Sequence, residues 1–229
     1  MSDIDCAGLS TREINRQIKA WIEDGDTEIV IRSPAARHNL AVGLLRPCRL
    51  RFEGSVGYYC AGLSDGPDVD ILGSAGWGLA ENLMSGRVVL RGNAGNSAGA
   101  SIRGGLVVVC GRAGARAGIS MKGGILVIGE DAGYMAGFMM QKGAIVICGD
   151  AGEALGDSIY EGRIFVGGEI ASLGNDAVIE DLTDDDRALL RAALGDAGLD
   201  AQRSFRKVVS GKQLYNFDKR EFARWRHAL

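Results

Sequence analysis

The sequence predicts an all-β core built as a parallel β-helix, a single-stranded solenoid of about seven coils with short helical flanks. Three observations predict this fold. Glycine accounts for 35 of the 229 residues and proline for only 3. This composition indicates a backbone conformation that requires glycine and recurs regularly. The glycines recur every nineteen residues. Each repeat also carries one short β-branched segment, which is typical of a strand.

The glycines fall into columns that stay in phase for more than a hundred residues. One column runs from Gly86 to Gly162, and another runs from Gly99 to Gly156. We expect corners at these positions, because glycine tolerates positive φ and close backbone approach. The column predicted to be structural comprises Gly57, Gly76, Gly95, Gly114, Gly133 and Gly152.

Apolar segments with the same period are the predicted strands. Nineteen residues are too few for a strand, a helix and two turns, and helical periodicity is absent from this region. Each coil is therefore expected to contribute one short strand to a stacked parallel sheet. The segments are 88–90, 106–109, 125–128, 144–147 and 164–166, with fainter copies at 50–52 and 69–72.

Alternation along these strands separates an interior from an outer face. The columns that begin at Val88 and Leu90 are predicted to point inward. The column between them is polar at Arg51 and Asp70 but apolar in later coils. A continuous apolar stripe is normally covered, either by the chain's own C-terminal helices or by a partner subunit or second copy. The second interpretation makes candidate interface residues of Val89, Val108, Val127, Val146 and Phe165.

The flanks of the solenoid are expected to be helical. Residues 9–22 place Ile14, Ile18 and Trp21 on one stripe. Residues 1–27 are therefore expected to form an N-terminal helical cap, because the open apolar end of a solenoid must be covered. The β-helix domain is predicted over 28–180.

The C-terminal segment, 181–229, is predicted to contain a helix and a tail. Thr183 and the three aspartates after it are typical of a helix start, and the helix is expected over 187–194. The tail carries aromatic residues among many lysines and arginines, so it is expected either to dock on a partner or to pack on the solenoid. Its aromatic residues are Phe205, Tyr215, Phe217, Phe222 and Trp225.

Composition limits the functional classes. The net charge is −3, which disfavours nucleic acid as the main partner. No apolar run is long enough for a membrane span, and the polar, acidic N-terminus does not resemble a signal peptide. The five cysteines form no CxxC pair, so we expect reduced thiols and a cytoplasmic protein. The two histidines, His38 and His227, exclude a histidine-rich metal site.

Glycine-rich loops and cysteines are the first candidate sites, and both favour a structural interpretation. The G-x-x-G loops recur in every coil and lead to another strand, whereas a dinucleotide loop leads to a helix. Cys110 and Cys148 lie two coils apart, about 9.6 Å from the ~4.8 Å strand spacing, which is too far for a disulfide. Cys60 has no nearby histidine to activate it.

Charged groups are the remaining candidates. Asp157, Tyr160 and Glu161 cluster in GDSIYEGR and provide a possible acid–base pair, but a solvated corner is the commoner role for such a group. Basic residues crowd the middle coils and would suit an acidic partner or a solvated face. No catalytic, cofactor-binding or metal-binding residue is therefore expected on this chain. A left-handed acyltransferase helix fits less well, since its period is eighteen and its enzymes use a catalytic histidine.

The coil motif G-x-x-G-x-x-x-G, as at Gly92, Gly95 and Gly99, resembles the GXGXG domain. That domain is the right-handed β-helix that closes the large chain of glutamate synthase, and it also forms a subunit of formylmethanofuran dehydrogenase. Several segments are similar in sequence to the branch of this family in which the β-helix is a separate subunit. These segments are 54–62, 73–86, 149–166, 172–178 and 210–217. The best-known assembly of that branch is N-methylglutamate synthase, which joins methylamine to glutamate and releases ammonia.

The resemblance implies a non-catalytic subunit of a hetero-oligomer. Its partners would be a glutamine-amidotransferase-like subunit and an FMN-binding glutamate synthase-like subunit, so FMN is expected on a partner and not on this chain. Two alternatives stay open: a subunit of a formylmethanofuran dehydrogenase or formyl-transfer complex, and a stand-alone β-solenoid binding module.

Overall fold

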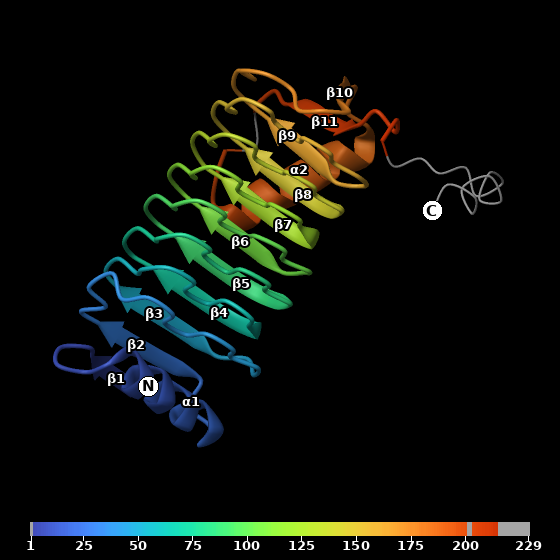
Figure 1. Cartoon of the computed structure of the whole chain (residues 1–229). Coiled ribbons are helices and arrows are strands. Elements are labelled where there is room, and N and C mark those ends of the chain that lie inside the picture. The colour runs from blue at the N-terminus through green and yellow to red at the C-terminus, as the bar shows by residue number, and fades with distance from the viewer. Residues whose placement is uncertain (1, 201–202, 215–229) are drawn as a thin grey trace, which may run out of the picture.

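A computed structural model describes residues 2–200 and 203–214 (Figure 1). It contains one sheet of eleven strands and two helices in those residues. The strands are β1 Ser2–Asp5, β2 Glu28–Arg32, β3 Arg49–Glu53, β4 Asp65–Ile71, β5 Ser85–Leu90, β6 Leu106–Val109, β7 Lys122–Ile128, β8 Lys142–Ile147, β9 Arg163–Val166, β10 Ala177–Glu180 and β11 Arg206–Ser210. The helices are α1 Thr11–Glu23 and α2 Asp184–Ala197.

The strands β1 to β9 stack in chain order and pair in parallel, as Figure 1 shows. From β3 to β9 the pairing advances by nineteen residues a coil, so that Val69 pairs with Val88 and Val88 with Val107. Those seven strands correspond to the seven predicted coils. The predicted parallel β-helix is therefore confirmed.

Each coil turns through a segment in which alternate residues have positive φ. In one coil these are Ser97, Gly99 and Ser101, with φ of 61°, 66° and 55°. The Gly99 column belongs to this turn. Glycine adopts that conformation without strain, which explains the four glycines of this column, Gly99, Gly118, Gly137 and Gly156.

The column that begins at Gly57 has a different physical reason from positive φ. Gly114 has no positive φ, but a Cβ there would lie 2.5 Å from Oδ1 of Asn96 and 2.9 Å from the backbone carbon of Gly95. Adjacent coils therefore approach too closely at this corner for any side chain. Close approach between adjacent coils is therefore the physical reason for glycine in this column.

The interior of the solenoid is filled by the two predicted inward columns. Val88, Leu126 and Ile164 are fully buried, as are Leu90 and Ile128 in the second column. One continuous hydrophobic cluster extends from α1 through all the coils to β11. This cluster forms the main core.

A second core lies on the outer face of the sheet, beneath α2. The five side chains of the outer apolar stripe, Val89, Val108, Val127, Val146 and Phe165, are fully buried there. They pack with Leu190, Ala193, Leu194 and Phe205. The chain's own helix therefore covers the stripe, which corrects the interpretation that these residues form a partner interface.

The length and direction of α2 match the stripe. At its first turn Asp186 bonds to Arg163 on β9, and near its end the carbonyl of Asp196 accepts from Arg87 on β5. Fourteen helical residues span about 21 Å, and five strands span about 19 Å. The helix thus covers those coils whose outer column is apolar.

The first coil is closed by α1. A capping box at Ser10 starts the helix, and Ile14, Ile18 and Ile22 are buried. Asn15 bonds to the carbonyl of Asn39 and the amide of Ala41 in the first turn. The helical cap is therefore present, and β1, which was not predicted, adds a parallel strand beside β2.

The last coil is followed by antiparallel pairing. The strand β11 lies between β9 and β10 and runs antiparallel to both. Its residues were predicted to belong to the C-terminal tail, but they complete the sheet. The predicted aromatic residues Tyr215, Phe217, Phe222 and Trp225 lie outside the described residues.

Candidate docking surfaces

Burial favours the thiol form of Cys6, Cys48, Cys60 and Cys148. Burial raises the pKa of Cys60 to about 12 and that of Cys48 to about 11. Burial also raises the pKa of Cys148, which the Arg203 guanidinium partly offsets. All five cysteines are free. Because a thiolate is the reactive form of cysteine, these environments favour a packing role.

The three residues of the predicted cluster, Asp157, Tyr160 and Glu161, do not form one site. Asp157 accepts hydrogen bonds from the hydroxyl of Ser158 at 2.7 Å and from the backbone amide of Asn175 at 3.1 Å. These bonds fix the last turn of the solenoid. Tyr160 and Glu161 instead line a hollow of about 460 Å³ together with three cations, Arg163, Lys207 and Lys212.

Within the described part of the chain, no group of three histidine, cysteine or acidic residues is placed to hold a metal ion. Likewise, neither described helix has the length and hydropathy needed to cross a membrane.

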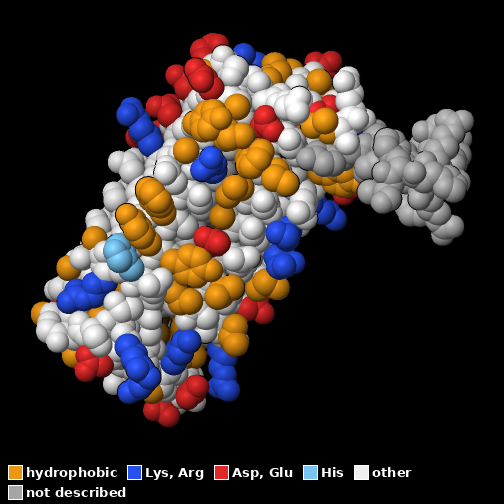
Figure 2. Space-filling model, viewed as in Figure 1, with side chains coloured by type: hydrophobic (Ala, Val, Ile, Leu, Met, Phe, Trp, Pro, Cys, Tyr) orange, Lys and Arg blue, Asp and Glu red, His pale blue; other side chains and the backbone are white. Residues whose placement is uncertain are grey.

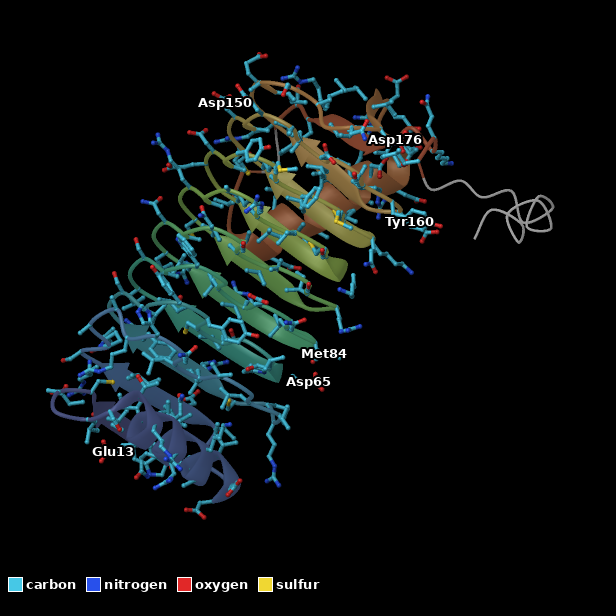
Figure 3. The ribbon with its side chains drawn as sticks, viewed as in Figure 1. Glu13, Asp65, Met84, Asp150, Tyr160 and Asp176 are labelled. Carbon is cyan, nitrogen blue, oxygen red and sulfur yellow. The ribbon has the colours of Figure 1, made fainter. Side chains whose placement is uncertain are left out.

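Polar residues at one corner form a ladder that joins the coils. The hydroxyl oxygen of Ser74 accepts from the backbone amide of Asn93, and Oδ1 of Asn93 accepts from the backbone amide of Arg112 at 2.8 Å. Further along, Oδ1 of Asp150 accepts from the backbone amide of Glu169. In Figure 3 Asp150 lies at this corner, whereas Met84 and Tyr160 lie at the opposite edge of the coils. These polar residues are structural.

An aromatic ladder occupies the start of the positive-φ turns. The rings of His38 and Tyr58 stack with centroids 4.3 Å apart, and those of Tyr58 and Trp77 with centroids 5.4 Å apart. Nδ1 of His38 also accepts a hydrogen bond from the backbone amide of Tyr58. Trp77 is nevertheless 55% exposed and Tyr58 47% exposed. Large exposed rings of this kind are typical of protein interfaces.

The rings of this ladder pack directly against the backbone of the glycines in the Gly57 column. A Cβ on Gly95 would lie 2.6 Å from Cδ1 of Trp77. Gly57 and Gly76 are overlain in the same way by the rings of His38 and Tyr58. The ladder therefore follows from the glycine column, and Tyr58 and Trp77 occupy equivalent positions nineteen residues apart.

Beside the ladder, a tyrosine ring and a carboxylate meet above a bare glycine. A Cβ on Gly78 would lie 3.0 Å from Oε2 of Glu81 and 3.3 Å from Cδ2 of Tyr59. Gly62 also makes room for the Tyr59 ring, since a Cβ there would lie 2.6 Å from its Cε1 atom. Partial burial raises the pKa of Glu81.

A second apolar cluster lies on the same turn face, three coils further along. Tyr134 and Met139 are exposed there, and Met135 and Phe138 are half-buried. Small residues separate the two clusters at 96–101, where no side chain is larger than Asn96. In the view of Figure 2, exposed hydrophobic side chains lie in separate patches along the molecule, one of them beside the histidine.

The uncovered part of the outer sheet face, over β2 to β4, is charged instead. Arg49 bonds to Glu28 at 2.9 Å and lies 3.8 Å from Asp68, and Arg91 bonds to Asp70 at 2.9 Å. Ion pairs of this kind are solvated and contribute little to stability. Their cross-strand pairing satisfies the charges within the chain.

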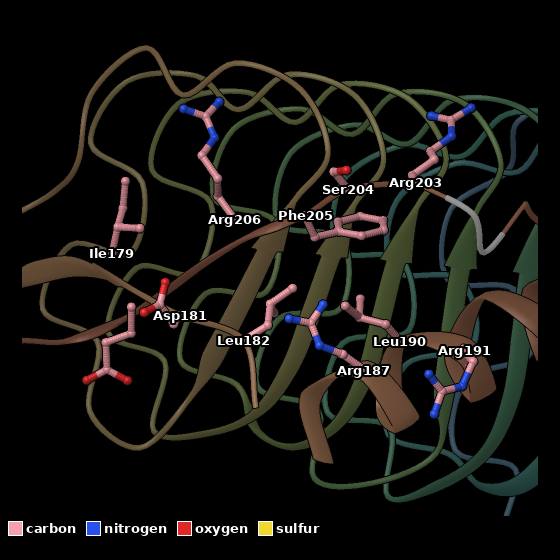
Figure 4. A pocket seen from close by; sticks show the side chains of 11 residues that line it. Ile179, Asp181, Leu182, Arg187, Leu190, Arg191, Arg203, Ser204, Phe205 and Arg206 are labelled. Atoms are coloured by element: carbon pink, nitrogen blue, oxygen red, sulfur yellow. The ribbon is translucent and has the colours of Figure 1, made fainter. Parts of the chain in front are cut away.

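A hollow of about 540 Å³ lies between α2, β10 and β11 (Figure 4). Four arginines line it, but they do not converge on one point. Arg203 donates to the carbonyl of Cys148 and Arg206 to that of Gly168. Arg187 and Arg191 project from α2 instead. The hollow is therefore a gap between packed elements, and its arginines are not arranged to bind one anion.

Sequence reasoning had not singled out Tyr59, Trp77 or Glu81 as site residues. A signal was present, because GYYCAG and GWGLAE place aromatic residues in equivalent positions of adjacent repeats. The sequence alone does not show which turn positions face outward. The fold shows that these aromatic residues are exposed.

Comparison with known proteins gives one relevant similarity. No family model matches this chain. Protein GlxC of Rhizobium meliloti (strain 1021) is 45% identical over 92 residues, which is 39% of this chain and 40% of GlxC. The matched segment therefore spans about two fifths of that relative's length.

Proposed function

We propose that this chain is a non-catalytic structural subunit of a glutamate synthase-like complex, with N-methylglutamate synthase as the specific assembly. The similarity to GlxC, at 45% identity over 92 residues, carries the proposal, and the glycine-coil motif of the sequence supports it separately. The β-helix supports it: a rigid stack of coils holds separate surfaces at fixed spacing, as a scaffold must. The two apolar clusters on the turn face, around Trp77 and Met139, offer such surfaces.

The proposed partners are a glutamine-amidotransferase-like subunit and an FMN-binding subunit. In that arrangement the chemistry belongs to the partners, and this chain fixes their distance. Joining methylamine to glutamate with release of ammonia would then depend on assembly and not on any side chain of the solenoid.

Co-expression tests this proposal directly. The chain is produced with the two candidate subunits from its own genome, and the complex is separated by size and scanned for flavin absorbance. We expect a yellow three-subunit complex that forms N-methylglutamate from methylamine and glutamate. Separate elution of the chain from both subunits would refute the scaffold role, whereas a complex without this activity would refute only the specific assembly.

A further inference from the structure

We infer that the outward face of α1 binds an acidic segment of a protein partner, with Arg12, Arg16 and Lys19 as its anchors. This inference rests on the proposed scaffold function. It adds a docking surface at the N-terminal end of the solenoid, apart from the two apolar clusters on the turn face. The occupant is defined by its chemistry: aspartate or glutamate side chains with an apolar residue beside them.

The first support is the placement of the cations. Arg12, Arg16 and Lys19 are exposed, and their spacing of four and then three residues puts them on one face of α1. The opposite face carries Ile14 and Ile18, which are buried in the main core. In Figure 2, Lys and Arg side chains gather at the end of the molecule that α1 closes in Figure 1. The cations of α1 therefore point away from the solenoid.

The second support is the room beside these side chains. All three line a hollow of about 680 Å³ on the helix surface. Lys19 also lines an adjoining hollow of about 300 Å³, whose other wall is the first-coil segment 43–46. Arg46 adds a fourth cation there, whereas Glu23 is the one acid that lines the two hollows. The surface is therefore cationic, and it has space for side chains of another chain.

The third support is the missing counter-charge. Within the part of the chain that the structure describes, the three cations of α1 form no ion pair and no side-chain hydrogen bond. The arginines of the neighbouring strands are paired instead, Arg32 with Asp3 and Arg49 with Glu28. Like charges four residues apart repel on a helix, and Arg12 lies in the first turn, where the helix dipole disfavours a cation. Carboxylates from another chain would offset both effects.

The fourth support is an apolar contact beside the charges. Among the described large hydrophobic side chains, Leu45 is the most exposed, at 74%, and it lines the second hollow. A protein segment can offer both an apolar side chain and carboxylates, which arginine binds through two parallel hydrogen bonds. An anionic membrane fits less well, because an interfacial helix inserts its apolar face, and that face of α1 is buried in the core.

The binding experiment compares two double variants of the full chain. Arg12→Gln with Arg16→Gln removes two cations from α1. Arg103→Gln with Arg116→Gln is the matched control, because these arginines are also exposed and form no ion pair among the described residues, but lie in the middle coils. The affinity of each variant for the purified amidotransferase-like and FMN-binding subunits is measured at low and high salt. Thermal unfolding of the isolated variants is measured alongside.

Carbodiimide coupling identifies the occupant directly, since this reagent joins an amine to a carboxylate that lies in contact with it. Lys19 is the only lysine in residues 1–121, so an amide formed at its Nζ can be located by mass spectrometry. In the wild-type complex we expect Lys19 to be joined to an aspartate or glutamate of one partner subunit.

The α1 variant should bind one subunit about tenfold or more weakly at low salt, and the difference should shrink at high salt because ions screen the lost pairs. The control should change affinity by less than about twofold. The melting temperature of the isolated α1 variant should not fall, because its arginines have no partner in the free chain. Leu45→Ser should weaken the same interaction at both salt concentrations.

Unchanged affinity of the α1 variant, with normal binding of the wild type, would overturn this inference alone. Equal losses in the α1 variant and the control would assign the effect to overall charge. Coupling of Lys19 to a second copy of this chain, or binding of the wild type to phosphatidylserine vesicles that the α1 variant loses, would assign the face to another occupant. Failure of the wild type to bind either subunit would overturn the proposed function and this contact with it.

Discussion

The carboxylate of Asp186 at the start of α2 accepts a hydrogen bond of 2.8 Å from Nη1 of Arg163 on β9. Its other oxygen lies 3.2 Å from Nζ of Lys207 on β11 and accepts from the backbone amide of Thr183. The Asp186 side chain is only 2% exposed. This contact ties α2 to the last coil and sets the helix in register with the apolar stripe.

Asp186→Ala should destabilise the protein by about 3 kcal/mol, because it removes the buried counter-charge that Arg163 and Lys207 share and leaves Lys207 only the exposed Glu180 carboxylate, at 3.3 Å. The free energy of unfolding in urea measures this change. Asp184→Ala is the control: Asp184 lies in the same first turn but is exposed, so only about 0.3–1 kcal/mol of helix-dipole interaction is lost. Equal effects of the two variants would contradict the role of the buried carboxylate.

Acid should weaken the attachment of α2 through the same group. Burial alone would raise the pKa of Asp186, but hydrogen bonds from Thr183, Lys207 and Arg163 outweigh it and lower the pKa to about 2. A depressed pKa adds stability above the unfolded value of about 3.9, and that stability is lost as pH falls toward 2. The contribution is about 2 kcal/mol.

The measurement is the free energy of unfolding at pH values between about 5 and 2. Wild type should lose more stability than Asp186→Asn across this range. Parallel losses in the two proteins would assign the acid sensitivity to other carboxylates.

Val127→Asp should unfold the outer core, since Val127 is fully buried beneath α2. Burying an unpaired carboxylate there costs several kcal/mol. Circular dichroism during thermal unfolding should show a large drop in melting temperature. Arg51→Ser, in the same column but exposed, should leave the melting temperature nearly unchanged. A folded Val127→Asp chain of normal stability would mean that α2 does not cover the stripe in solution.

Gly114→Ala should lower stability by about 1–3 kcal/mol through overpacking, because the new Cβ would meet the backbone of the preceding coil at 2.9 Å. Gly195→Ala provides the matched control: Gly195 lies in α2, has no positive φ, and has no atom within 4 Å of a Cβ. That variant should gain about 0.5–1 kcal/mol from helix propensity. Opposite signs in urea unfolding are the expected result, and a tolerated Gly114→Ala would refute close approach as the cause.

The repeat in the sequence was enough to establish the solenoid. A period of nineteen residues places equivalent residues on top of one another, so Val88, Val107 and Leu126 had to share one face and one register. The capping residue Thr183 likewise marked the start of α2, since a cap depends on residues within one turn.

Only the tertiary structure shows which segment covers the apolar stripe from Val89 to Phe165. An apolar stripe has the same sequence whether a helix of the same chain or another subunit covers it, and both interpretations had been open. The placement of α2 depends on Arg163, Lys207 and Asp186, which come from three elements distant in sequence. The antiparallel strand β11 is likewise set by pairing partners far along the chain.

The reason for each glycine column was also a tertiary matter. Sequence periodicity showed that Gly57 and its equivalents were required, but both positive φ and close approach demand glycine. Only the stacked coils show that ring and backbone atoms of the preceding coil fill the space. The meeting of Tyr59 and Glu81 above Gly78 has the same origin: local repeats fix the period of the fold, whereas contacts between coils fix what each surface presents.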